Sequence, residues 1–170
     1  DFKDRLVLTP MEIRPAMKAY LLFSLIALII FSISPDGISY QAALTHGGRF
    51  ILLGGLAVLS GALITPLLLP YIPSRSFAVK GFLTGLAATA ATLLLTGWAS
   101  VIHPMLTVFS MIFFPLASSY IGLQFTGSST YTVISGVKKE LRYGVPVYIA
   151  GAALSVLTIA AYKLSEWGFL

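Results

Sequence analysis

Apolar residues are gathered into five stretches, each close to the roughly 20 residues that a helix needs to cross the hydrocarbon core of a bilayer. Short segments that hold proline, glycine or charged residues separate these stretches. The pattern predicts an all-α membrane protein, a bundle of five transmembrane helices. The expected spans are residues 16–33, 50–72, 81–102, 105–125 and 145–164.

The segments between the spans also have expected roles. Residues 1–15 form a junction with a short interfacial elbow at 10–14, because Thr9 and Pro10 favour a helix start and Pro15 interrupts it. A polar segment at 126–144 separates the last two spans. The transmembrane domain is therefore expected over residues 16–170.

Basic residues fall almost entirely on one side of this arrangement. Only Arg49 and Lys163 lie on the other side. Loops rich in Lys and Arg remain cytoplasmic, so the N-terminus is expected in the cytoplasm and the C-terminus outside. This predicts a multi-pass protein of the cytoplasmic (inner) membrane. The basic residues assigned to the cytoplasmic side are Lys3, Arg5, Arg14, Lys18, Arg75, Lys80, Lys138, Lys139 and Arg142.

Composition narrows the class further. Hydrophobic residues make up 57% and charged residues 10% of the chain, which favours the lipid bilayer as the surroundings. The formal charge of +5 is explained by the one-sided basic loops, so a nucleic-acid partner is not expected. The chain has no cysteine, which excludes a disulfide, a thiolate metal ligand and a thiol nucleophile within it.

Small residues at helical spacing predict where the spans pack. Glycine lets two helix backbones approach closely, and neighbouring hydroxyls can bond across the contact. A compact bundle explains this pattern, and a dimerisation face at Gly81-x-x-x-Gly85 is the alternative. The glycines expected at helix contacts are Gly54, Gly61, Gly81, Gly85 and Gly151.

No catalytic, cofactor-binding or metal site is expected in this chain. All acidic residues lie outside the predicted spans, which is evidence against an ion-coupled carrier but not against a passive pore. His46 and His103 have no third ligand nearby in the sequence and make a weak metal site. The Ser and Thr residues lack a paired base by spacing, so enzyme activity cannot be assigned to this chain from its residues.

One polar segment differs from the rest of the bundle. It is rich in hydroxyl side chains over residues 126–132, and a basic stretch follows. Ser135 or Gly136 can cap a short helix that Gly144 would end. The hydroxyls can satisfy one another at the membrane surface, or they can face a polar ligand or docking domain.

Two segments also resemble a known family. Residues 125–142 read FTGSSTYTVISGVKKELR, and residues 4–10 read DRLVLTP. Both are similar to segments of the mercury-methylation corrinoid proteins, which are related to the corrinoid iron–sulfur protein of the acetyl-CoA pathway. The first is similar to a segment of their membrane part, and the second to the junction where that membrane part begins.

The resemblance implies a methyltransferase whose soluble corrinoid (cobalamin) domain precedes Asp1. A cysteine of that domain coordinates cobalt in the family, a ferredoxin-like iron–sulfur protein supplies electrons, and the methyl group passes from cobalt to Hg(II). The membrane domain would anchor the corrinoid domain and dock it, or its partner, through a cytoplasmic loop. The residues expected in that loop are Phe125, Thr126, Gly127, Ser129, Tyr131, Thr132, Ser135, Gly136, Val137, Lys138, Lys139 and Glu140.

Two other functions remain open from the sequence. A small transporter or pore would pass a metal, a thiol complex or a product along the polar threonines of the third span. A membrane scaffold would assemble partners without binding a ligand. The threonines concerned are Thr84, Thr89, Thr92 and Thr96.

Overall fold

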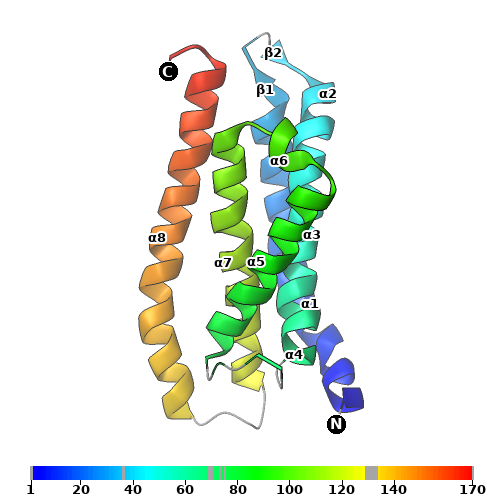
Figure 1. The fold of residues 1–170 in the computed structure, drawn as a ribbon, viewed down its shortest axis with the longest axis vertical. Coiled ribbons are helices and arrows are strands. Elements are labelled where there is room, and N and C mark those ends of the chain that lie inside the picture. Colours follow the sequence, from blue (N-terminus) through cyan, green and yellow to red (C-terminus); the bar gives the residue numbers. More distant parts are fainter. Residues whose placement is uncertain are drawn as a thin grey trace.

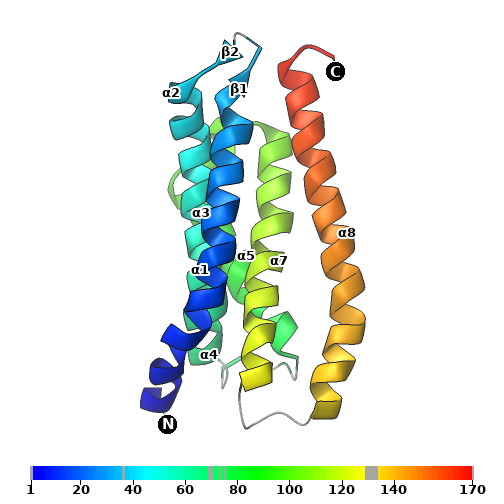
Figure 2. The same ribbon diagram turned by 180° about the vertical axis from the view of Figure 1, so that it is seen from behind.

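The chain folds into helices that run alternately up and down one elongated bundle (Figures 1 and 2). A computed structural model covers residues 1–170, and the chain start and chain end lie at opposite ends of the bundle. The structure describes the backbone except at residues 1, 36, 69–70, 73, 75, 129–133 and 170. Outside those positions, side chains are described for residues 16–124 and 140–169.

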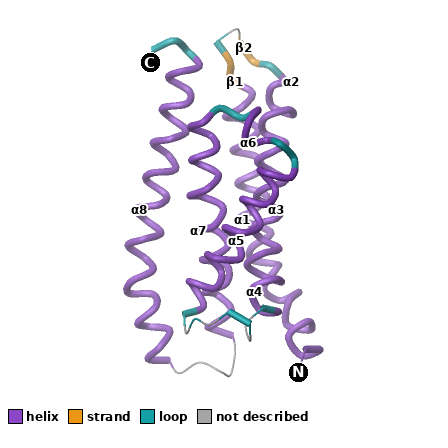
Figure 3. The backbone as a smooth tube through the Cα atoms, viewed as in Figure 1, coloured by secondary structure: helices purple, strands orange, loops and turns teal. Residues whose placement is uncertain are grey.

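Long helices account for most of the described backbone, as the tube in Figure 3 shows. A two-residue antiparallel pair, β1 and β2, turns the chain after the first helix. A nearly continuous helical run, which includes two π-helical segments, then returns it. The elements are α1 Phe2–Ser32, β1 Ile33–Ser34, β2 Gly37–Ile38, α2 Tyr40–Ala42, π-helix Ala43–Gly47, α3 Gly48–Leu59, π-helix Ser60–Ile64, α4 Thr65–Leu67, α5 Phe77–Leu95, α6 Trp98–Val101, α7 Pro104–Ser128 and α8 Ile134–Glu166.

Four of these helical runs are long enough and apolar enough to cross a bilayer. Ala16–Ser32 is a shorter apolar helix. The chain is therefore an all-α protein, and its helices are consistent with a multi-pass membrane protein. The four runs are Tyr40–Leu67, Phe77–Leu95, Pro104–Gln124 and Glu140–Glu166.

The first span differs from the expectation at its start. The helix does not stop at Pro15, because α1 is helical from Phe2 onward. A proline removes one backbone hydrogen bond, and this can kink a helix without ending it. In Figures 1 and 2 the N-terminal part of α1 bends away from the bundle instead.

The second and third spans are shifted toward the N-terminus. The helical run expected over 50–72 starts at Tyr40, where Ser39 caps it, and ends at Leu67. The helix expected over 81–102 starts at Phe77 and ends at Leu95. Gly97 then takes a left-handed conformation (φ 67°), which reverses the backbone before the short α6.

The polar segment expected at 126–144 is mostly helical. Helix α7 continues to Ser128, and α8 starts at Ile134 and runs without a stop through Gly144 and Pro146. Gly144 does not adopt the left-handed conformation that would end a helix there. Pro146 therefore lies inside α8 and does not open it. Membrane helices tolerate an internal proline where other groups bond to the carbonyl oxygen that the proline leaves free.

Aromatic rings form much of the buried core. Phe50, Phe109 and Phe114 are almost fully buried, and their ring centroids lie 5.6–6.2 Å apart. Phe31 stacks on Phe50 at 4.9 Å, which brings α1 into the same cluster. These contacts hold α1, α3 and α7 together, while α8 packs mainly along α7.

Three glycines approach helix α7 closely at Ser118. A Cβ atom added at Gly61 or at Gly81 would lie 2.7 or 2.9 Å from the Ser118 carbonyl oxygen, and one at Gly85 would lie 2.5 Å from the Ser118 Cβ. The Gly81 and Gly85 face therefore packs against a helix of the same chain. Of the other two expected contacts, Gly151 faces Leu116 and Gly54 faces Phe23 and Tyr20.

Candidate functional site at the N-terminal end of the bundle

The start of α5 is fixed by a side chain from α8. Ser76 precedes the helix in an extended conformation, and its hydroxyl accepts a hydrogen bond from the Val79 amide (3.4 Å). The first amides of a helix have no partner within the helix. Here the Phe77 and Ala78 amides donate to the Glu140 carboxylate, at 3.2 and 3.4 Å. A carboxylate at this position also interacts favourably with the positive end of the helix dipole.

Helix α7 joins the same arrangement through Ser119. The Ser119 hydroxyl donates to the Ala78 carbonyl oxygen (2.7 Å) and shares a hydrogen bond with the Tyr148 hydroxyl (2.9 Å). Tyr148 belongs to α8, and its ring meets the Tyr120 ring edge-on at 5.6 Å. The ends of α5, α7 and α8 are thereby connected by side-chain hydrogen bonds.

A cavity of about 640 Å³ lies between these three helix ends. Its walls are mostly apolar, and the polar groups that reach it are those that connect the helices. Tyr143 at its edge is 68% exposed. The Glu140 carboxylate accepts hydrogen bonds from two backbone amides here, which is the arrangement of a helix cap. The lining residues are Ser76, Ala78, Val79, Phe82, Leu116, Ser119, Glu140, Tyr143, Gly144, Val147 and Tyr148.

Basic side chains are more available at this end than at the opposite end. Lys18 and Arg142 are exposed, whereas Lys80 in the first turn of α5 is only 8% exposed. At the opposite end, Lys163 donates to the Ile33 carbonyl oxygen (2.7 Å) and to Glu166 (2.6 Å), and Arg49 lies over the Trp98 ring. The exposed cations at the N-terminal end suit contact with an acidic surface.

The expected docking loop is only partly described. Residues 129–133 lie outside the described backbone, and the side chains of residues 125–139 lie outside the described side chains. This covers every expected docking residue except Glu140. Backbone positions are given for 125–128 at the end of α7 and for 134–139 at the start of α8.

Both histidines lie at the opposite end of the bundle. His46 and His103 line a polar cavity of about 510 Å³ together with Tyr162, Ser165 and Glu166. Within the described part of the chain, no group of three or more His, Cys, Asp or Glu side chains is placed to hold a metal ion. The His103 ring packs against Tyr162 at 5.4 Å, and the His46 ring stacks beside Phe31 at 6.3 Å.

Three of the four threonines expected along a transport path have hydrogen-bond partners within the bundle. Thr92 and Thr96 donate to carbonyl oxygens one turn earlier in the chain, at 2.8 and 2.6 Å. Thr84 bonds to Thr65 across the helix contact at 2.7 Å. Thr89 is 2% exposed and lines none of the cavities described here. The geometry of these hydroxyls therefore gives no support to a transport path.

Sequence reasoning missed the hydrogen bonds that organise this end of the bundle. Ser76 before an apolar run was a recognisable cap signal. The partnership between Glu140 and the start of α5 had no sequence signal, because 62–63 positions separate the groups. The same holds for Ser119 and Tyr148, which are 29 positions apart.

Comparisons with known proteins identified no related protein. No protein-family model, no curated protein and no solved structure matches the chain. What is established is therefore an all-α chain with four helices able to cross a membrane and a shorter apolar N-terminal helix.

Proposed function

We propose that this chain is the membrane domain of a corrinoid-dependent methyltransferase of the mercury-methylating kind. It would anchor a soluble corrinoid domain that precedes Asp1 and dock that domain or its ferredoxin-like partner. The observation that carries the proposal is the resemblance of residues 4–10 and 125–142 to that family.

The arrangement of the helices supports this assignment. The start of α1, the end of α7 and the start of α8 lie at the same end of the bundle (Figures 1 and 2). A domain attached before α1 would therefore lie beside the α7–α8 connection. Glu140 adds a fixed geometry, because its bonds to α5 hold the first turns of α8 in one position.

The proposed orientation has five crossings, with the N-terminus in the cytoplasm and the C-terminus outside the inner membrane. Four of these crossings would be the helical runs that are long enough to span a bilayer, and the fifth would be the shorter apolar helix Ala16–Ser32. The exposed Lys18 and Arg142 would face the cytoplasm, where positive residues are retained.

The corrinoid itself does not fit this chain. The family coordinates cobalt through a cysteine of its soluble domain, and this chain contains no cysteine. No step of methyl transfer is therefore assigned to residues of the bundle. The role proposed for them is to anchor and position.

The docking role is tested in the native, full-length protein. Lys138 and Lys139 are both changed to Glu, and the double change of the same two residues to Arg, which keeps their positive charge, serves as the control. We expect the double variant to lose partner binding and methyl transfer to Hg(II), and the control to retain both. Unchanged binding and methylation in the double variant would refute the docking role.

The mass and N-terminal sequence of the native polypeptide test the class of enzyme separately. A corrinoid-binding domain with a cobalt-coordinating cysteine before Asp1 is expected. A native protein that lacks such a domain would remove the methyltransferase proposal, whatever the lysine variants do.

A further inference from the structure

An apolar crevice of about 500 Å³ separates α1 from α8, with α7 at its base. The two helices are joined near one end of the bundle, where Lys163 donates to the Ile33 carbonyl oxygen and the Tyr162 ring lies 6.2 Å from Phe31. Below this end, α1 lines the crevice from Ala19 to Phe31, and α8 lines it from Ala152 to Ala160.

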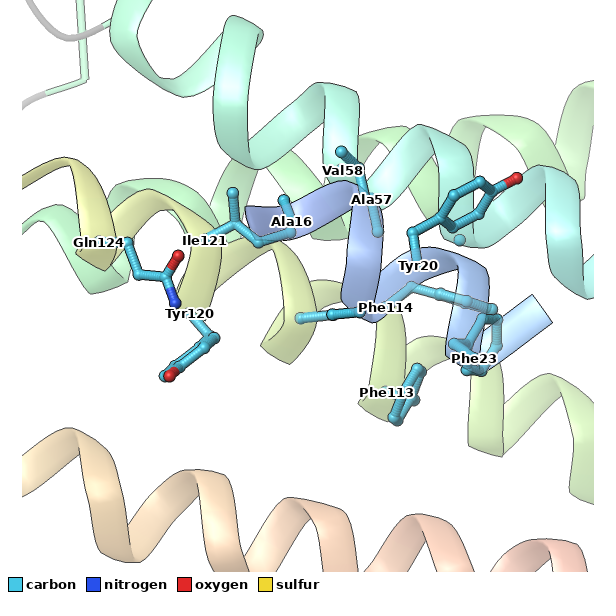
Figure 4. Close-up of a pocket in the computed structure, with 13 residues that line it drawn as sticks. Ala16, Tyr20, Phe23, Ala57, Val58, Phe113, Phe114, Tyr120, Ile121 and Gln124 are labelled. Carbon is cyan, nitrogen blue, oxygen red and sulfur yellow. The ribbon is translucent and has the colours of Figure 1, made fainter. Parts of the chain in front are cut away.

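A second cavity, of about 180 Å³, adjoins this crevice. It lies between α1, α3 and α7 (Figure 4), and the two share Ala19, Phe23 and Phe113 in their walls. In Figure 4, Phe23 lies toward one end of this cavity, and Tyr120 and Gln124 lie at the other. The two cavities together follow α1 toward the N-terminal end of the bundle.

The crevice is lined by hydrocarbon. Its one hydroxyl side chain, Ser155, donates to the Gly151 carbonyl oxygen of its own helix at 2.7 Å. Water in such a space would lose hydrogen bonds without replacement, so an apolar occupant is favoured. Three of the helical runs that line the crevice are long enough to cross a membrane, which makes lipid the available apolar molecule.

The length of the crevice suits an extended chain. Ala19 to Phe31 spans about 18 Å along α1 at about 1.5 Å per residue. A single acyl chain can follow a crevice of this length, and a helix of a second copy is the alternative occupant that the experiment below distinguishes.

Polar groups lie where the headgroup of such a molecule would be. The side-chain amide of Gln124 and the Tyr120 hydroxyl belong to residues that line the smaller cavity, and Tyr120 is 49% exposed. Lys18, which precedes the lining residue Ala19, is exposed and positively charged. An amide, a hydroxyl and an ammonium group together match the ester and phosphate oxygens of an anionic lipid.

We propose that the crevice between α1 and α8 binds one acyl chain of an anionic membrane phospholipid, whose headgroup lies at Lys18, Tyr120 and Gln124. This inference does not depend on the proposed methyltransferase role. It assigns a lipid site to the helix bundle itself.

Native mass spectrometry of the detergent-solubilised chain, after incubation with phosphatidylglycerol or phosphatidylcholine, tests the site. We expect one phosphatidylglycerol retained per chain and weaker retention of phosphatidylcholine. Ala152→Leu fills the crevice, and we expect it to lower the retained fraction roughly tenfold, equivalent to about two methylene groups that lose their burial. Ala153→Leu is the matched control, because Ala153 is exposed on the same helix and does not line the crevice.

Three results would overturn the proposal. These are equal retention by the two alanine variants, no lipid retained by the unaltered chain, or a lipid-free dimer that Ala152→Leu abolishes. Circular dichroism verifies that both variants remain folded. A phosphatidylglycerol with a photoreactive acyl chain gives a second readout in the unaltered protein. It should label peptides of α1 and α8 that line the crevice, and labelling confined to other faces would also count against the site.

Discussion

Replacement of Gly61 by alanine should destabilise the bundle through steric overlap with α7. The added Cβ would lie 2.7 Å from the Ser118 carbonyl oxygen and 2.8 Å from the Ile121 Cβ. Neither atom is the flexible end of a side chain, so the helices themselves must separate. Overpacking of this kind costs about 1–3 kcal/mol. Alanine regains about 0.5–1 kcal/mol over glycine in a helix, which leaves a net loss of about 0–2.5 kcal/mol, centred near about 1 kcal/mol.

Gly48→Ala is the matched control in the same helical run. A Cβ at Gly48 would meet nothing within 4 Å, so only the gain in helix propensity should remain. Titration with SDS in mixed micelles, followed by circular dichroism, gives the free energy of unfolding of each variant. The difference between the two variants isolates the packing cost. If Gly61→Ala proves as stable as Gly48→Ala, the close approach of the two helices is refuted.

Three further predictions follow from individual contacts. Thr65→Val removes the buried hydroxyl pair across the α4–α5 contact and should lower the free energy of unfolding by about 0.6–1.7 kcal/mol. Thr92→Val affects a hydrogen bond within one helix and should change the free energy of unfolding less. Similar losses in the two variants would count against the hydroxyl pair. Glu140→Gln should cost about 0.3–1 kcal/mol and speed hydrogen exchange of the first amides of α5, as NMR can measure; unaltered exchange would argue against the carboxylate contact. Because the chain has no cysteine, Tyr71→Cys and Phe169→Cys, both at exposed positions, can each be labelled with a membrane-impermeant maleimide in sealed vesicles. We expect labelling from opposite sides of the membrane, and labelling from the same side would exclude an odd number of crossings between these two positions.

The sequence was most informative inside the apolar stretches. Four of the five expected spans coincide with helices able to cross a membrane, and the fifth with the shorter Ala16–Ser32. A backbone in hydrocarbon has no water to bond to, so a long apolar stretch of an all-α chain has little choice but to form a helix. This constraint depends only on composition and length, and both can be read from the chain.

Helix ends were predicted less well, because the membrane does not constrain them. Pro15 and Gly144 each predicted a boundary, and the structure continues a helix through both of them. Near the ends of a bundle, a backbone group can bond to water, to a cap or to another helix, so several endpoints are compatible with the same residues.

The sequence by itself determined the helical class, the approximate spans and the small residues that allow close packing. Only the tertiary structure decided which helix each small residue faces, with Gly61, Gly81 and Gly85 converging on Ser118. It also decided that Glu140 binds the start of α5, and that α1 and α8 leave a crevice between them. The physical reason is that local pattern is set by neighbours along the chain, whereas these contacts join residues far apart in sequence, whose meeting depends on how whole helices pack.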